Sequence, residues 1–324
     1  MRCITNADLI SGKLDYRFSP HECELPVELR RDLQEADIVF AFGFAALQLV
    51  VKEQVAADTV LVTFETVLEL PPETKERCIH VLHEANVLGV VVFAQFFQQF
   101  LRRHFGLDSI WVRYNLPTEV ADEIRNGTWK LAAEGTGRPF VFCPTRISPR
   151  KNLDKVIQLA HRLRSDSIDV RVSGGLEDSL YPAYARELVQ ANEKAGRPLS
   201  FNRTSLSDAE MREQFAACLC VISTADVEAF GIFALEAIHH GKPVVSFDSI
   251  GIRELAEFDQ MRSIRLVGTV EEIATEVAQM SAMSTYYQET LSQVDAYRRC
   301  YNRLVDFDRL LQDAIEKLYR KRKR

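Results

Sequence analysis

The sequence lacks a long apolar run. Its most apolar stretch, 87–94, is far shorter than the ~20 residues that a membrane-spanning helix needs. A C-x-x-C pair is also missing, and the odd count of 7 cysteines in a chain that opens without a signal peptide indicates reduced thiols in the cytoplasm. No G-x-G-x-x-G pattern follows a predicted strand, which argues against a nicotinamide-dependent dehydrogenase.

Basic residues are fewer than acidic ones. The chain of 324 residues has 40 Lys and Arg against 46 Asp and Glu, and its net charge of −6 argues against general affinity for nucleic acid. Six of the cations, however, lie at Lys317 and from Arg320 to Arg324, so the remainder of the chain carries −12. This basic tail is either a solvated, frayed chain end or a weak tether to anionic lipid at the inner face of a membrane.

From residue 37 onward, apolar runs typical of buried strands alternate with amphipathic helical segments. Strands are predicted at 38–42, 59–64, 87–93, 109–114, 140–143, 170–173, 199–201, 221–222, 244–245 and 264–267, and the chain ends in helical segments at 270–280 and 286–319. Such alternation predicts an α/β fold with parallel sheets covered by helices on both faces. With 47% hydrophobic residues, the chain is long enough for two cores.

Glycines and polar residues break the apolar pattern between residues 118 and 138. We therefore expect two Rossmann-like domains joined by a linker in which a hinge would let them close on a ligand. The expected divisions are a short first domain at 1–117, the linker at 118–138, a second domain at 139–285, and helices with the basic tail at 286–324.

The stretch 221–245 carries the strongest chemical signal. A buried strand ends in a polar loop, and Gly231 admits a helix whose free amides and positive dipole end suit a phosphate. Glu228 ahead of the helix and Glu236 within it can each accept hydrogen bonds from hydroxyl groups. Two polyol contacts around a phosphate describe a nucleotide sugar. The alternative is that Glu228 is a solvated loop acid and Glu236 a half-exposed helix residue.

This stretch resembles the E-x7-E signature of retaining glycosyltransferases with the GT-B fold, in particular the large family 4. The similarity rests on 228–237 and 241–245, with Ala229 where family members usually have glycine. In that family the first acid contacts hydroxyls of the donor sugar and the second contacts the ribose. The resemblance implies these roles for Glu228 and Glu236, and contacts to the diphosphate from Phe230, Gly231, Ile232 and Phe233.

A cationic loop runs from Arg146 to Lys151, after the strand at 140–143 and before a helix, where a doubly wound sheet binds anions. Arg146 and Lys151 match the family's R-x4-K diphosphate clamp, and together they can neutralise the charge on a departing nucleoside diphosphate. The resemblance also implies a glycine turn beside the nucleotide and a loop that meets the base, at Gly174, Gly175, Arg203 and Thr204.

The first domain, which the resemblance places on the acceptor side, matches the family only over about 87–117. The opening strand and glycine-rich loop of the family are not recognisable in residues 1–36. Where family members often place a histidine facing the sugar, this chain has Glu65 as the nearest polar residue. The acceptor therefore stays unassigned.

The leading interpretation is a retaining glycosyltransferase that moves a sugar from a nucleoside-diphosphate-sugar donor to the hydroxyl of a glycan, lipid-linked or small-molecule acceptor. Catalysis is assigned to Glu228, Arg146 and Lys151. We expect no cofactor and no metal, because the nucleotide sugar is a substrate, and no nucleic-acid partner. A non-catalytic GT-B-like sugar-binding partner subunit remains an alternative. A GT-B nucleotide-sugar epimerase is a second one, which the E-x7-E spacing disfavours.

Overall fold

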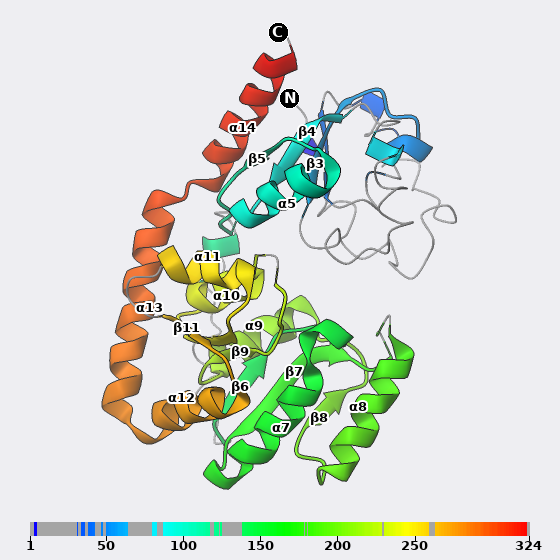
Figure 1. Cartoon of the computed structure of the whole chain (residues 1–324). Helices are drawn as coiled ribbons and strands as arrows, with labels where there is room; N and C mark the ends of the chain where they lie inside the picture. The colour runs from blue at the N-terminus through cyan, green and yellow to red at the C-terminus, as the bar shows by residue number, and fades with distance from the viewer. Residues whose placement is uncertain are drawn as a thin grey trace. The chain divides into compact units, whose positions relative to one another are not determined.

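The computed structural model (Figure 1) describes residues 3–4, 31, 34–35, 38–42, 47, 50–63, 80–82, 87–116, 120–122, 124, 138–177, 179, 181–228, 230–258 and 263–322. Glu65, most of residues 1–36 and most of the expected linker at 118–138 lie outside the described residues. The chain divides into two compact units, one of Met1–Tyr114 with Phe307–Arg324 and one of Asn115–Asp306. Each unit is presented by itself below.

The first unit is built on a five-stranded parallel sheet in the order β1-β2-β3-β4-β5. Its strands are β1 (Cys3–Ile4), β2 (Ile38–Phe42), β3 (Asp58–Thr63), β4 (Val87–Val92) and β5 (Ser109–Trp111). The stretches 60–62 and 90–92 are buried on both faces, as expected of central strands in a covered parallel sheet. Helix α5 (Gln95–Phe105) joins β4 to β5.

The end of the chain returns to this first sheet as helix α14 (Phe307–Arg322), which packs against β4. Gly89 in β4 permits the close approach, because a Cβ atom there would lie 2.3 Å from Cδ2 of Leu318. The rings of Phe93, Tyr114 and Phe307 form an aromatic cluster with centroids 4.9 to 5.6 Å apart. The apolar face of α14 is thus part of the core of the first unit.

The second unit contains a six-stranded parallel sheet in the order β11-β10-β9-β6-β7-β8. The strands are β6 (Phe140–Cys143), β7 (Asp169–Gly175), β8 (Ser200–Asn202), β9 (Val221–Ser223), β10 (Val244–Phe247) and β11 (Ile264–Val267). The chain moves outward from β6 through β7 to β8, then returns to the other side of β6 with β9. This reversal creates a topological switch point between β6 and β9.

Helices cover both faces of the second sheet (Figure 1). They are α7 (Leu153–Leu163), α8 (Pro182–Lys194), α9 (Asp208–Ala217), α10 (Ile232–His239), α11 (Ile250–Phe258), α12 (Val270–Ala282) and α13 (Ser284–Leu304), with short 3-10 turns η3 (Pro149–Lys151) and η4 (Arg164–Asp166) beside α7. Val141 and Cys143 share a core with α7 and α12, whereas the Phe142 ring meets Phe215 of α9. This alternation is the two-residue period of a strand.

The predicted α/β fold with two parallel sheets is confirmed. The predicted helical segment at 286–319 is wrong in one respect, because Val305 leaves helical geometry and the segment divides into α13 and α14. The Val305 carbonyl accepts a hydrogen bond from Nδ2 of Asn115 at 3.3 Å, a contact across 190 residues that local periodicity cannot reveal. Across the described parts of the chain, every helix is too short or too polar to cross a lipid bilayer.

Candidate active site

An ion pair lies at the switch point of the second sheet. Lys151 ends the turn after β6, Glu228 lies in the loop after β9, and Lys151 Nζ donates a hydrogen bond to Glu228 Oε2 at 2.7 Å. The two side chains are only 17% and 5% exposed. A pair of charges so far removed from water needs partners to offset its desolvation. The structure thus brings the predicted cation and the predicted acid into direct contact.

Neutral hydrogen bonds join the same two loops. The Thr224 hydroxyl donates to the carbonyl oxygen of Lys151 at 2.8 Å and lies 3.2 Å from that of Asn152. In return, Nδ2 of Asn152 donates to the carbonyl oxygen of Thr224 at 3.0 Å. These hydrogen bonds therefore hold the loops after β6 and β9 together.

Helix α10 begins shortly after Glu228 in the sequence, with Gly231 as its N-cap. Gly231 has a φ of 82°, and a Cβ atom there would lie 2.0 Å from Cδ1 of Ile252, so only glycine fits both the conformation and the space. The Gly251 amide donates to the carbonyl oxygen of Glu228 at 2.8 Å, which ties α11 to the loop. Phe230 is buried, whereas Ile232 and Phe233 are half-buried at the helix N-terminus. The N-terminal amides of α10 thus begin beside the ion pair, in the setting that favours an anion.

Glu236 lies on α10 and lines a cavity of about 230 Å³ with residues of α9 and of the segment before the sheet: Val120, Ile124, Asp208, Met211, Arg212, Phe215 and His240. Burial, together with the negative charge of Asp208, raises the pKa of Glu236 to about 7, while Arg212 opposes the shift. Burial also lowers the pKa of His240 to about 4, so that this imidazole is neutral near pH 7. Glu236 therefore changes its charge near neutral pH.

Gly174 and Gly175 allow three loops to meet. A Cβ atom on Gly174 would lie 2.7 Å from the Thr145 carbonyl oxygen, and one on Gly175 would lie 2.2 Å from the carbonyl carbon of Thr204. The Ser173 hydroxyl donates to the same Thr145 oxygen at 3.0 Å. These glycines are explained by the close approach of the neighbouring backbone segments, and their predicted contact with a nucleotide stays a prediction.

The remaining predicted residues lie at the surface. Arg146 is exposed beside Thr145 in the loop after β6. Arg203 donates from Nε to Glu177 Oε1 at 2.7 Å, and both side chains are more than half exposed. Thr204 is exposed next to it. Lys151, Glu228 and the start of α10 are thus adjacent, whereas Arg203 is engaged with another side chain and Glu236 faces the cavity beside α9.

Sequence reasoning missed three residues that shape the site. Thr224 directly follows the buried strand β9, and a polar residue at the carboxyl end of a central strand was the available signal. Asn152 adopts a left-handed conformation with φ of 48° between η3 and α7. The hydroxyl oxygen of Tyr184 in α8 accepts a hydrogen bond from the Leu153 amide at 3.1 Å. This contact joins residues 31 positions apart, and no local sequence pattern indicates it.

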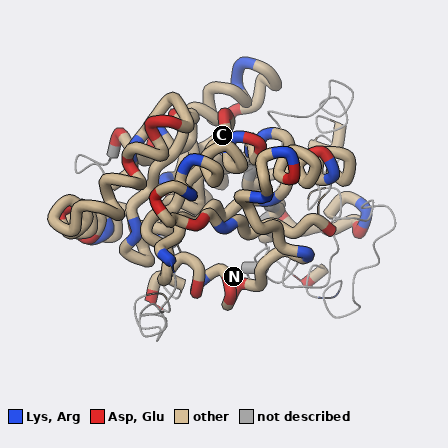
Figure 2. The backbone as a smooth tube through the Cα atoms, turned by 90° about the horizontal axis from the view of Figure 1, so that it is seen from below, with Lys and Arg blue, Asp and Glu red and all other residues tan. Residues whose placement is uncertain are grey.

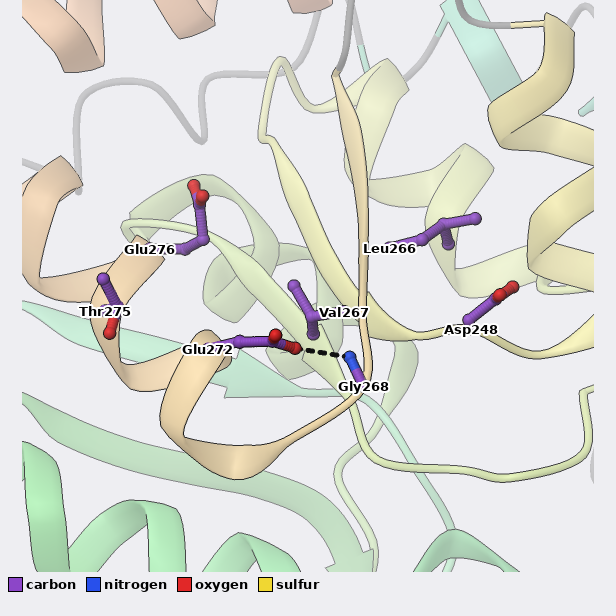
Figure 3. Close-up of a pocket in the computed structure, with 7 residues that line it drawn as sticks. All are labelled: Asp248, Leu266, Val267, Gly268, Glu272, Thr275 and Glu276. Atoms are coloured by element: carbon purple, nitrogen blue, oxygen red, sulfur yellow. Dashed lines mark hydrogen bonds between the residues drawn. The ribbon is translucent and has the colours of Figure 1, made fainter.

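A second cavity, of about 520 Å³, opens at the edge of the sheet between β11 and α12 (Figure 3). Its acidic side chains already bind neighbouring groups of the protein. Glu272 accepts from the Gly268 amide at 2.6 Å, the dashed contact in Figure 3, Asp248 holds Arg253 at 2.7 Å, and Glu276 holds Arg265 at 3.1 Å. The ion pair of Lys151 and Glu228 at the switch point is therefore the better candidate for ligand binding.

The site at Lys151, Glu228 and the start of α10 has three complementary binding elements. A carboxylate accepts hydrogen bonds from hydroxyl groups, an ammonium attracts phosphate oxygens, and helix amides donate to the same oxygens. Together they suit a ligand in which hydroxyl groups and phosphate are close neighbours. A sugar linked to a diphosphate has this chemistry.

Comparison with known proteins gives two similarities in sequence. The profile of the family "Glycosyl transferases group 1" matches residues 130–293, about half of the chain. The chain is also 30% identical over 128 residues to alpha-1,3/1,6-mannosyltransferase ALG2 of Mus musculus, a match that covers 36% of this chain and 30% of the mouse protein. The similarity thus extends over less than a third of that relative.

Solved structures share the fold over most of the chain. HepE of Anabaena in complex with UDP and glucose has a TM-score of 0.67 at 20% identity, over 90% of this chain and 80% of its own. Sucrose-phosphate synthase of Thermosynechococcus elongatus has a TM-score of 0.64 at 15% identity, over 92% of this chain and 80% of its own. The predicted GT-B fold is confirmed, and with the family profile over the second unit these findings show that the chain belongs to the glycosyl transferases group 1.

Proposed function

We propose that this protein is a retaining glycosyltransferase that moves a sugar from a nucleoside-diphosphate sugar to an acceptor hydroxyl. The observation that carries the proposal is the contact between Lys151 and Glu228 in front of α10. This contact puts a hydroxyl-binding carboxylate and a phosphate-binding ammonium at one place. It supports a ligand with both groups close together.

In the proposed reaction, the bond between the anomeric carbon and the diphosphate oxygen breaks, and its electron pair stays on the diphosphate. The acceptor oxygen forms the new bond on the same face of the sugar, and its proton passes to the departing phosphate oxygen. Lys151, the exposed Arg146 and the first amides of α10 stabilise the negative charge on that diphosphate. Glu228 orients the sugar hydroxyls, so catalysis is mainly positioning and charge stabilisation.

We propose a uridine nucleotide as the first donor to test. HepE of Anabaena was solved with UDP, with UDP-glucose, and with UDP and glucose. A panel of UDP-, GDP- and ADP-sugars screened by thermal shift and then by slow hydrolysis measures both binding and turnover. Stabilisation by one nucleotide class followed by release of its sugar supports the transferase, and an absence of both across the panel contradicts it.

The same panel separates the alternatives. A non-catalytic sugar-binding subunit would be stabilised by a nucleotide sugar or a glycan without releasing sugar. An epimerase would convert one nucleotide sugar into its isomer. The mass and the anomeric configuration of the product decide between these outcomes, and an α-linked product from an α-linked donor is the expected result.

We further propose that the protein works in a reducing compartment such as the cytoplasm, in weak contact with anionic lipid. The buried free thiols of Cys143, Cys218 and Cys220 support the reducing compartment.

The lipid contact is proposed for the basic end of α14. There Lys321 pairs with Asp108 at 3.0 Å, next to the basic last turn of α5. Elsewhere, acidic and basic residues are interspersed along the backbone (Figure 2). Salt-sensitive sedimentation with phosphatidylserine vesicles, but not with phosphatidylcholine vesicles, is expected, and equal recovery with both contradicts the lipid contact.

A further inference from the structure

The Lys151 side chain is flexible and does not by itself fix the position of its ammonium group. An ammonium on a flexible four-carbon stem attracts anions without strong directional preference, so the ion pair with Glu228 alone does not define where the charge lies. The position is set by the backbone from which the stem extends. That backbone is the end of η3, where the chain turns sharply through the left-handed Asn152.

Thr224 holds this turn from the neighbouring loop. It is 1% exposed, and its hydroxyl donates to the Lys151 carbonyl oxygen at 2.8 Å. The side-chain Nδ2 of Asn152 donates in return to the Thr224 carbonyl oxygen. Leaving one partner of a buried hydrogen bond unsatisfied is costly, so the arrangement is strongly preferred.

A further ion pair near these two loops is weaker. Lys155 and Asp226 pair at 3.2 Å, but the Asp226 side chain is 64% exposed and that of Lys155 is 33% exposed. Solvent-exposed ion pairs contribute little to stability. The buried hydroxyl of Thr224 is therefore the better candidate for the contact that fixes the turn.

We infer that Thr224 is a positioning residue for the diphosphate clamp: it touches neither the proposed donor nor the reacting atoms, and it sets where Lys151 presents its charge. The inference rests on the proposed function. It adds a residue outside the E-x7-E and R-x4-K patterns, in the segment 224–226 that follows β9. Loss of its hydroxyl should displace the Lys151 ammonium although no charged residue has been substituted.

Thr224→Val removes the hydroxyl and keeps the shape, while Thr224→Ser keeps the hydroxyl. The matched control is Thr290→Val in α13, because Thr290 is also 1% exposed and donates to a backbone carbonyl, that of Tyr286, at 2.8 Å. Both valine variants should lose similar thermal stability. Any difference between them in ligand binding then reports on the clamp.

Calorimetry with UDP, inorganic pyrophosphate and uridine tests the inference. Thr224→Val should bind UDP and pyrophosphate at least fivefold more weakly, with uridine unchanged, while Thr224→Ser and Thr290→Val stay within twofold of the wild type. Equal affinities for UDP and pyrophosphate in Thr224→Val and the wild type would overturn it. A wild type that binds none of the three ligands contradicts the proposed function instead.

A measurement without ligand keeps the two failures distinct. The Lys151 amide donates to the Ser148 carbonyl oxygen at 3.1 Å, so its hydrogen exchange reports on the order of the turn. Thr224→Val should speed exchange across 148–153 at least threefold relative to Thr290→Val. Identical exchange in the two variants would overturn the positioning role even where nucleotide binding is intact.

Discussion

The ammonium of Lys151 lies 2.7 Å from the carboxylate of Glu228, although 77 residues separate them in the chain. In the sequence these residues belong to two patterns with different expected ligands, diphosphate for one and sugar hydroxyls for the other. In the folded protein they share a hydrogen bond. Each therefore affects the environment of the other, and substitutions at the two positions are expected to be non-additive.

Lys151→Ala should reduce both stability and diphosphate affinity. The variant leaves the carboxylate of Glu228 buried without its ammonium partner, and breaking a buried pair from one side costs about 3–5 kcal/mol. Loss of the charge-assisted contact to diphosphate should cost about 1.5–3 kcal/mol of binding free energy. Urea unfolding and calorimetry with UDP measure the two effects.

Two variants serve as controls for that result. Lys155→Ala removes a cation from an exposed pair and should change stability by about 0–1 kcal/mol. Arg146→Ala, at an exposed position, should weaken UDP binding by about 1.5–3 kcal/mol with little loss of stability. Unchanged UDP affinity in both Arg146→Ala and Lys151→Ala refutes the clamp.

Glu228→Gln should separate binding from turnover. The amide oxygen of glutamine can still accept a hydrogen bond from Lys151, but it is a weaker acceptor for sugar hydroxyls. Free UDP should bind nearly as before, whereas turnover should fall more than tenfold, since each ~1.36 kcal/mol lost in the transition state is a factor of ten. Steady-state kinetics and calorimetry on one preparation check this. Parallel losses of UDP affinity and turnover would mean that Glu228 supports the loop.

The sequence was sufficient to predict the α/β fold and its strands, because buried parallel strands such as 140–143 and 244–247 are continuous apolar runs. It also predicted the start of α10, since Gly231 signals a backbone position that other residues do not adopt. The partners of side chains were beyond its reach. The contacts of Thr224 with Lys151 and of Arg203 with Glu177 join residues 73 and 26 positions apart, and local periodicity carries no information on such distances.

Glu236 should make the stability of the protein depend on pH. Its folded-state pKa of about 7 lies above the ordinary value of 4.5, so the folded protein holds this proton more tightly than the unfolded chain. The resulting stability is fully present below about pH 4.5 and is lost as pH rises through about 7. Urea unfolding of the wild type and of Glu236→Gln between pH 5 and pH 8 isolates this contribution. As pH rises, the free energy of unfolding of the wild type should fall relative to that of the variant.

If Glu236 accepts hydrogen bonds from the ribose, the affinity for a nucleoside should increase as pH rises, whereas the stability of the protein decreases. The carboxylate form is the better acceptor, so the affinity for uridine should rise with pH through about 7 in the wild type and stay flat in Glu236→Gln. Calorimetry at pH 6 and pH 8 checks the slope. The same slope in the variant and the wild type would assign the titration to another group.

Gly231→Ala should be more damaging than Gly241→Ala, although both glycines have left-handed conformations, with φ of 82° and 72°. An alanine in that region costs about 1–2 kcal/mol at either position. Space around Gly241 is open, whereas the new Cβ at 231 would lie 2.0 Å from Cδ1 of Ile252 and must displace it. Overpacking of this kind adds about 1–3 kcal/mol, which urea unfolding can resolve.

The clashing atom can be removed to test that cause. Ile252→Val deletes Cδ1 and keeps the rest of the side chain, at its own cost of about 0.5–1.5 kcal/mol. In the Ile252→Val background, Gly231→Ala should therefore lose less stability than it does with isoleucine at 252, although Cγ1 at 3.2 Å remains a tight contact. UDP affinity should fall in Gly231→Ala, because α10 must shift its first amides, and recover in the double variant. A penalty at 231 that is the same with isoleucine and valine at 252 would place the cause in the backbone conformation alone.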